Sequence, residues 1–160
     1  MNSRIEDLVD MPKNQPSLHD EFKPDLTPQQ MLELGVFGGA YFGQEDMKEF
    51  PAEWFKGARL SVHGPDPACN YFGVLASQPH KVWAEKGWLS SYDPLGWFQW
   101  YCRYYQGRRI DQEDERQIKR WKAMRRHVGQ IRKACHPGDA ACHTKQRQAL
   151  LHWAYDSRNL

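Results

Sequence analysis

One segment, residues 92–105, constrains the fold of this chain more than any other. Its sequence, YDPLGWFQWYCRYY, places seven aromatic side chains within fourteen positions. Asp93 suits a helix N-cap, Pro94 suits the first helical turn and Gly107 suits the stop that follows a helix. The segment therefore predicts a helix over about 94–106 with rings on most of its sides. Because such a helix is stable only when other elements cover it, we expect it at the centre of the fold.

Helical signals also dominate the rest of the chain. From Ile118 to Cys135 the apolar residues are spaced three or four positions apart, which predicts a long helix over about 112–134 with a narrow apolar stripe. The sequence contains no clean strand alternation and no internal repeat. We therefore predict a mostly α fold. Residues 25–160 should form a compact single-domain helical fold with long loops. Residues 1–24 contain three prolines and show no sustained hydrophobic periodicity, which predicts a flexible or extended N-terminal arm.

Length and composition exclude several classes of protein. The chain has 160 residues, a mean hydropathy of −0.84 and no apolar run of about 18 residues, so no membrane span is expected. The first residues lack the basic start and apolar run of a signal peptide, which predicts a cytoplasmic protein. Four cysteines are too few for a disulfide scaffold. The motifs of P-loop NTPases, serine hydrolases and zincin proteases are absent, and no cofactor is expected.

Charge is divided unevenly between the two parts of the chain. Residues 1–102 have a net charge of −6, whereas residues 103–160 have a net charge of +8. Residues 116–133 alone carry eight basic side chains and no acidic one. This pattern predicts binding to nucleic acid or another polyanion, with release of counterions from the phosphates. The residues expected to contact phosphate are Arg103, Arg108, Arg109, Lys119, Arg120, Lys122, Arg125, Arg126, Arg132 and Lys133, with base stacking on Trp or Tyr as an addition. The alternative is a solvated helix face, or one that docks on the acidic part of the chain.

A different class of function would use the rings of the aromatic helix. If some of them line a pocket rather than the core, the protein is a small cofactor-independent enzyme for an anionic or planar substrate. The pocket would then contain Trp97, Trp100, Tyr101, Arg103 and Tyr104. Acid–base or nucleophilic groups would come from His63, Asp66, Cys69, Tyr101 and Tyr104. Convergence of Arg103 and the tyrosine hydroxyls on a cavity would favour the enzyme, and an open cationic face would favour nucleic acid. A third hypothesis is an adaptor whose basic helix binds an acidic protein.

Two Cys-His pairs, Cys135-His136 and Cys142-His143, lie close together in the sequence. Four potential zinc ligands thus fall within nine residues. Structural zinc sites usually combine a close cysteine pair with a distant second pair, and this spacing is missing. We therefore predict no metal, with Cys135 closing the apolar stripe and Cys142 packed beside it. A disulfide between them is an alternative under oxidising conditions.

Overall fold

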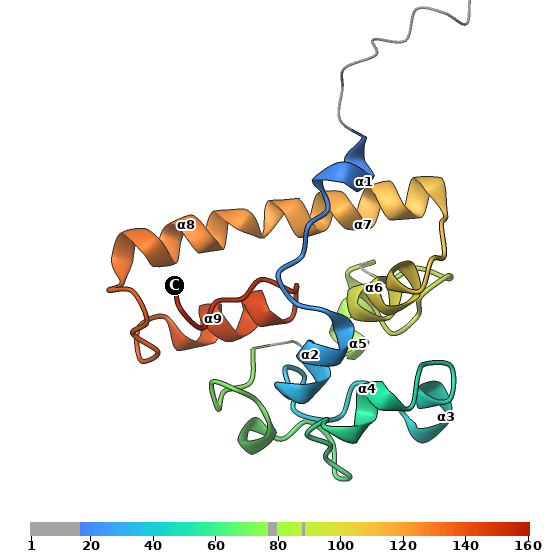
Figure 1. Cartoon of the computed structure of the whole chain (residues 1–160), viewed down its shortest axis with the longest axis horizontal. Coiled ribbons are helices and arrows are strands. Elements are labelled where there is room, and N and C mark those ends of the chain that lie inside the picture. The colour runs from blue at the N-terminus through green and yellow to red at the C-terminus, as the bar shows by residue number, and fades with distance from the viewer. Residues whose placement is uncertain (1–16, 77–79, 88) are drawn as a thin grey trace, which may run out of the picture.

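A computed structural model describes residues 17–76, 80–87 and 89–160. Helices account for all of the regular structure in these residues, so the predicted mostly α fold is confirmed (Figure 1). None of these helices is long and apolar enough to cross a membrane. The elements are α1 (Leu18–Glu21), α2 (Pro28–Glu33), α3 (Gln44–Met47), α4 (Glu53–Lys56), the 3-10 helix η2 (Pro67–Cys69), α5 (His80–Glu85), α6 (Trp97–Tyr105), α7 (Asp111–Ala123), α8 (Arg125–Ala134) and α9 (Thr144–Leu151).

The predicted basic helix is two helices rather than one. α7 and α8 follow one another along one side of the molecule and are separated at Met124 (Figure 1). The Met124 N–H bonds to the Trp121 carbonyl at 3.1 Å, three residues back. This hydrogen bond spans three residues instead of the four of an α-helix, so it tightens the last turn of α7, as is common at helix ends. Beneath this pair, α9 lies alongside α8, and the C-terminal residues lie between them.

The aromatic helix α6 begins three residues later than the sequence predicts. Gly96 is the N-cap, with φ of 113°, a conformation that L side chains rarely adopt. Asp93 does not cap the helix, because its carboxylate accepts hydrogen bonds from Arg103 and Arg108. The prediction that this helix is central is confirmed by its burial, since five of its rings, the Cys102 thiol and the Gln99 side chain are all buried.

Phe22, just after α1, is the ring around which the core aromatics gather. It lies 5.5 Å from Trp100, 5.4 Å from Tyr104 and 4.9 Å from Trp121, measured between ring centroids. Phe22 is 8% exposed. Residues 1–16 of the predicted arm lie outside the described residues, whereas residues 17–24 contain α1 and this buried ring.

The C-terminal segment closes the core behind α9. The Tyr155 hydroxyl donates to the Trp121 carbonyl at 2.5 Å. Arg147 is fully buried and donates to the carbonyls of Cys142, Ser157 and Leu160. These bonds tie the last residues to α7 and α9.

Candidate binding cavity and basic helices

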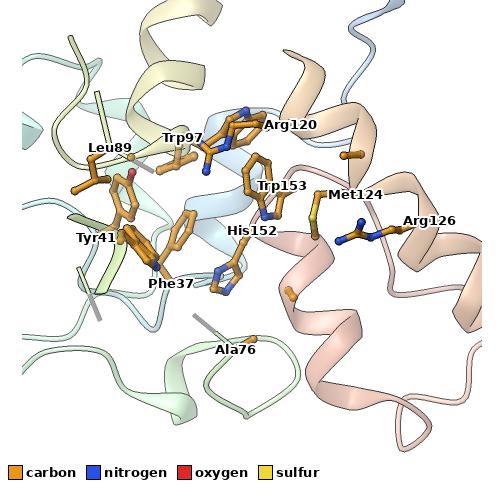
Figure 2. A pocket seen from close by; sticks show the side chains of 15 residues that line it. Phe37, Tyr41, Ala76, Leu89, Trp97, Arg120, Met124, Arg126, His152 and Trp153 are labelled. Atoms are coloured by element: carbon orange, nitrogen blue, oxygen red, sulfur yellow. The ribbon is translucent and has the colours of Figure 1, made fainter. Parts of the chain in front are cut away.

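A cavity of about 520 Å³ lies where the start of α6 meets α7, α8 and α9 (Figure 2). This volume falls in the range of small-molecule sites. Six of its fifteen described lining residues are Phe, Tyr or Trp, and these rings come from segments that are far apart in the sequence. The described lining residues are Phe37, Tyr41, Ala76, Trp83, Leu89, Gly96, Trp97, Phe98, Arg120, Ala123, Met124, Arg126, Ala149, His152 and Trp153.

Two ring clusters contribute to this wall. Phe37 contacts Tyr41 at 4.5 Å and His152 at 4.7 Å between ring centroids. Trp97 contacts Trp153 at 5.0 Å, and its indole N–H donates to the Gln117 carbonyl at 3.2 Å. The rings are therefore held by packing and by hydrogen bonds to the backbone, which makes the wall largely preformed.

The cavity reaches the backbone at Gly96. A Cβ atom at this position would lie 3.3 Å from both the Trp83 ring and the Tyr41 hydroxyl. That hydroxyl donates to the Leu95 carbonyl at 2.7 Å and accepts from the Gln99 N–H at 3.1 Å. Glycine is thus required by both its positive φ and this close approach, and the start of α6 is locked against Tyr41.

Both charged side chains on the described lining are arginines. The Arg120 guanidinium lies over the Trp153 ring, 5.2 Å from its centroid, and donates to the Gln117 side chain at 2.9 Å. Arg126 lies on the Met124 side of the cavity (Figure 2). No Asp or Glu is among the described lining residues. The wall therefore carries positive charge, because arginine stays protonated even where burial lowers its pKa, as it does for Arg120.

The two titratable rings of the wall, Tyr41 and His152, are both uncharged at neutral pH. Burial raises the pKa of Tyr41 well above its usual value. Burial also lowers the pKa of His152 to about 4. A neutral phenol that is already bonded and a weakly basic imidazole give the cavity polar contacts but no strong acid or base.

No family model, curated protein or solved structure matches the chain.

The predicted pocket shares one residue with this cavity. Of its residues, Trp97 lines the cavity, whereas Trp100, Tyr101, Arg103 and Tyr104 are not among the lining residues. The Trp100 indole donates to Asp114 at 2.8 Å and the Tyr101 hydroxyl donates to the Leu26 carbonyl at 2.6 Å. These rings pack in the core, because a helix with rings on every side can direct only a few of them towards one cavity.

The predicted catalytic residues are not brought together. The Asp66 carboxylate accepts from the Ala68 N–H at 2.9 Å and so caps η2. His63 is exposed and Cys69 is a half-buried free thiol, and no described hydrogen bond joins the side chains of these three residues. Burial raises the pKa of Tyr101 far above its usual value, and the Tyr104 hydroxyl contacts the His19 ring at 2.7 Å. Among the described residues, these side chains therefore make separate contacts and do not form one catalytic group.

Several predicted phosphate-binding residues have partners within the chain. Arg103 binds Glu49 and Asp93, and Arg108 binds Asp93. Arg109 lies 3.6 Å from the centre of the Tyr104 ring. Of the basic residues in α7, Lys119 pairs with Glu115 of the same helix and Lys122 pairs with Glu21 of α1. Arg125 lies over the Trp121 ring at 4.9 Å.

Four of the predicted phosphate-binding side chains lie on α8. Arg125, Arg126, Arg132 and Lys133 are all exposed there, and residues 116–138 contain no acidic residue. The exposed cationic surface is therefore shorter than the sequence predicts. Acidic side chains in the first turn of α7 and in neighbouring segments pair with basic residues outside α8.

Cys135 and Cys142 form a disulfide that joins the end of α8 to the turn before α9. The bridge that the sequence allows under oxidising conditions is thus present. Cys69 and Cys102 are free thiols.

Proposed function

We propose that this protein binds a small anionic ligand with a flat ring system in the cavity between α6, α7, α8 and α9. One observation carries the proposal: the wall combines several aromatic rings with Arg120 and Arg126 and holds no described carboxylate (Figure 2). Rings favour stacking with a planar ligand. Guanidinium groups favour carboxylate, sulfonate or phosphate, because their N–H donors match such oxygens in pairs.

The proposal is one of binding rather than of catalysis. The described wall offers no cysteine, serine or carboxylate, and the hydroxyl of Tyr41 is already a donor and an acceptor. His152 is a weak base, with a pKa of about 4. These groups suit the orientation of a ligand better than proton transfer at neutral pH.

The first test compares two probes that share their rings but differ in charge. Anilinonaphthalene sulfonate carries an anionic group, whereas N-phenyl-1-naphthylamine does not, and both gain fluorescence in apolar sites. We expect the folded protein to bind one equivalent of the sulfonate. The variants Arg120→Gln and Arg126→Gln should each weaken its binding about tenfold, which corresponds to the loss of one charge-assisted contact of about 1.4 kcal/mol. Binding of the neutral probe should change much less.

Two further variants separate the cavity from the surface. Arg132→Gln removes an exposed cation of α8 that does not line the cavity, so it should leave sulfonate binding unchanged. Ala149→Phe places a ring inside the cavity and should abolish binding of both probes. Equal loss in Arg132→Gln and Arg126→Gln, or full binding by Ala149→Phe, would overturn the proposal.

Binding of nucleic acid through α8 is a second candidate, favoured by the four exposed basic side chains of that helix. Its test is fluorescence anisotropy of labelled single-stranded DNA over a range of salt concentrations. The double variant Arg132→Glu and Lys133→Glu should weaken binding and flatten the salt dependence by about 0.7 log unit per lost contact. Lys56→Glu, on the distant α4, is the matched control. No binding at low salt would rule out this candidate.

A further inference from the structure

The disulfide lies beside a histidine. One potential ligand atom from each of Cys135, Cys142 and His143 lies within 4.8 Å of the other two. The two cysteines are half-buried and the histidine is exposed, so solvent and ions reach the cluster. We propose that the reduced form of this pair, together with His143, binds a thiophilic divalent cation of the Zn²⁺ class.

The donor set fits such a cation. Two thiolates and one imidazole supply three of the four ligands of a tetrahedral Zn²⁺ site and leave one position for water. Their two negative charges neutralise the charge of the ion. Soft sulfur ligands also discriminate against Mg²⁺ and Ca²⁺, which prefer oxygen.

The fold brings these three residues close together, although their spacing in the sequence is not that of a usual zinc site. Cys135 is the C-cap of α8 and His143 is the N-cap of α9. The turn between them reverses the chain, with the Asp139 N–H bonded to the His136 carbonyl and the Cys142 N–H bonded to the Asp139 carbonyl. Two rigid helix ends, rather than a single short loop, therefore hold the three ligands together.

A neighbouring amide orients the imidazole. The side-chain N–H₂ of Gln146 donates to Gln130 at 2.6 Å and lies 2.8 Å from the ring nitrogen of His127. The amide oxygen of Gln146 is therefore the atom that faces His143 Nδ1, at 3.1 Å. A carbonyl oxygen accepts, so Nδ1 carries the proton and Nε2 keeps the lone pair for a metal. Metal-binding histidines commonly have such a second partner.

The disulfide and the metal exclude one another. A dithiol reductant supplies two electrons and two protons, which break the S–S bond and give two thiols, while the reductant itself becomes a disulfide. The cation then displaces the two thiol protons into solvent and binds the thiolates. Either link joins α8 to α9, and both helices contribute to the cavity wall through Arg126 and Ala149.

Cobalt provides the test, because a tetrahedral Co²⁺–thiolate site gives visible and near-ultraviolet absorption bands. The full chain is reduced, freed of reductant without oxygen and titrated with Co²⁺, followed by competition with Zn²⁺. We expect one equivalent of Co²⁺ with a thiolate charge-transfer band, displaced by Zn²⁺. The chain reoxidised with a disulfide oxidant should show no such band.

Variants assign the ligands. Cys142→Ser should lose the thiolate band, and Cys69→Ser, which removes a half-buried thiol elsewhere, should keep it. His143→Ala retains both cysteines and should bind Co²⁺ at least about tenfold more weakly, since loss of an outer partner alone costs about that much. Absence of the band in the reduced chain, or its survival in Cys142→Ser with unchanged affinity in His143→Ala, would overturn the proposal.

Discussion

At the scale of single residues, the carboxylate of Asp93 holds the segment before α6 to the rest of the molecule. It is fully buried and accepts from Arg103 at 2.9 Å and from Arg108 at 2.6 Å. Arg103 also binds both oxygens of Glu49, which lowers the pKa of that glutamate and raises the pKa of the arginine. The network therefore joins α6, the loop before it and the turn after α3.

Removing this carboxylate should be costly. Asp93→Ala leaves two partly buried guanidinium groups without their shared partner, and we expect a loss of about 3 kcal/mol in the free energy of unfolding. Glu45→Ala is the control, because its pair with Lys48 is exposed on both sides and should contribute less than about 0.5 kcal/mol. Urea denaturation measures both, and similar losses in the two variants would contradict this role for Asp93.

His152 gives the stability of the fold a pH dependence. Its pKa is about 4 in the folded protein against 6.5 in the reference state, so the unfolded chain binds a proton more readily. The contribution to stability is complete above about pH 6.5 and is lost as the pH falls towards 4. Between pH 7 and pH 5 we expect a loss of about 2 kcal/mol.

The control for this pH effect is His152→Gln, which removes the titrating group. Thermal or urea unfolding at several pH values should then show a smaller difference between pH 7 and pH 5 than in the unmodified chain. NMR of the His152 ring, with a midpoint near pH 6.5 instead of about 4, would contradict the account.

At the scale of elements, the buried ring of Phe22 links the segment after α1 to α6 and α7. Phe22→Ala removes a ring that contacts Trp100, Tyr104 and Trp121, so we expect a loss of about 3–4 kcal/mol in stability. Tyr92→Ala serves as the matched control, because the Tyr92 side chain is 54% exposed. Urea denaturation that shows no difference between the two variants would mean that residues 17–24 lie outside the cooperative core.

The helices themselves were predictable where local signals were strong. The periodicity of Ile118, Trp121 and Ile131 predicted the buried stripe, and these residues are fully or almost fully buried. The start of α6 was not predictable in the same way. Asp93 and Pro94 have the local features of a helix start, but two arginines compete for the Asp93 carboxylate, and this competition is visible only in three dimensions.

At the scale of the whole molecule, the balance of charge and the aromatic cavity both depend on contacts between segments that are far apart in the sequence. The basic residues Arg103, Arg108 and Lys122 pair with Glu49, Asp93 and Glu21, respectively. Glu21 and Lys122 are 101 positions apart in the sequence. The cavity draws on residues from Phe37 to Trp153. No pattern along the chain marks this convergence, and Trp97 is the one predicted pocket residue among the described lining residues.

The central claim is that an anionic ring compound occupies this cavity, and the indole N–H signals of the tryptophans test it most directly. In NMR titrations with anilinonaphthalene sulfonate, the signals of Trp97 and Trp153 should shift and saturate at one equivalent, because both line the cavity. The signals of Trp100 and Trp121, which are buried elsewhere, should hold their positions. Each signal is assigned with a Trp→Phe variant. Shifts confined to tryptophans that do not line the cavity, or shifts of all signals that never saturate, would contradict the account.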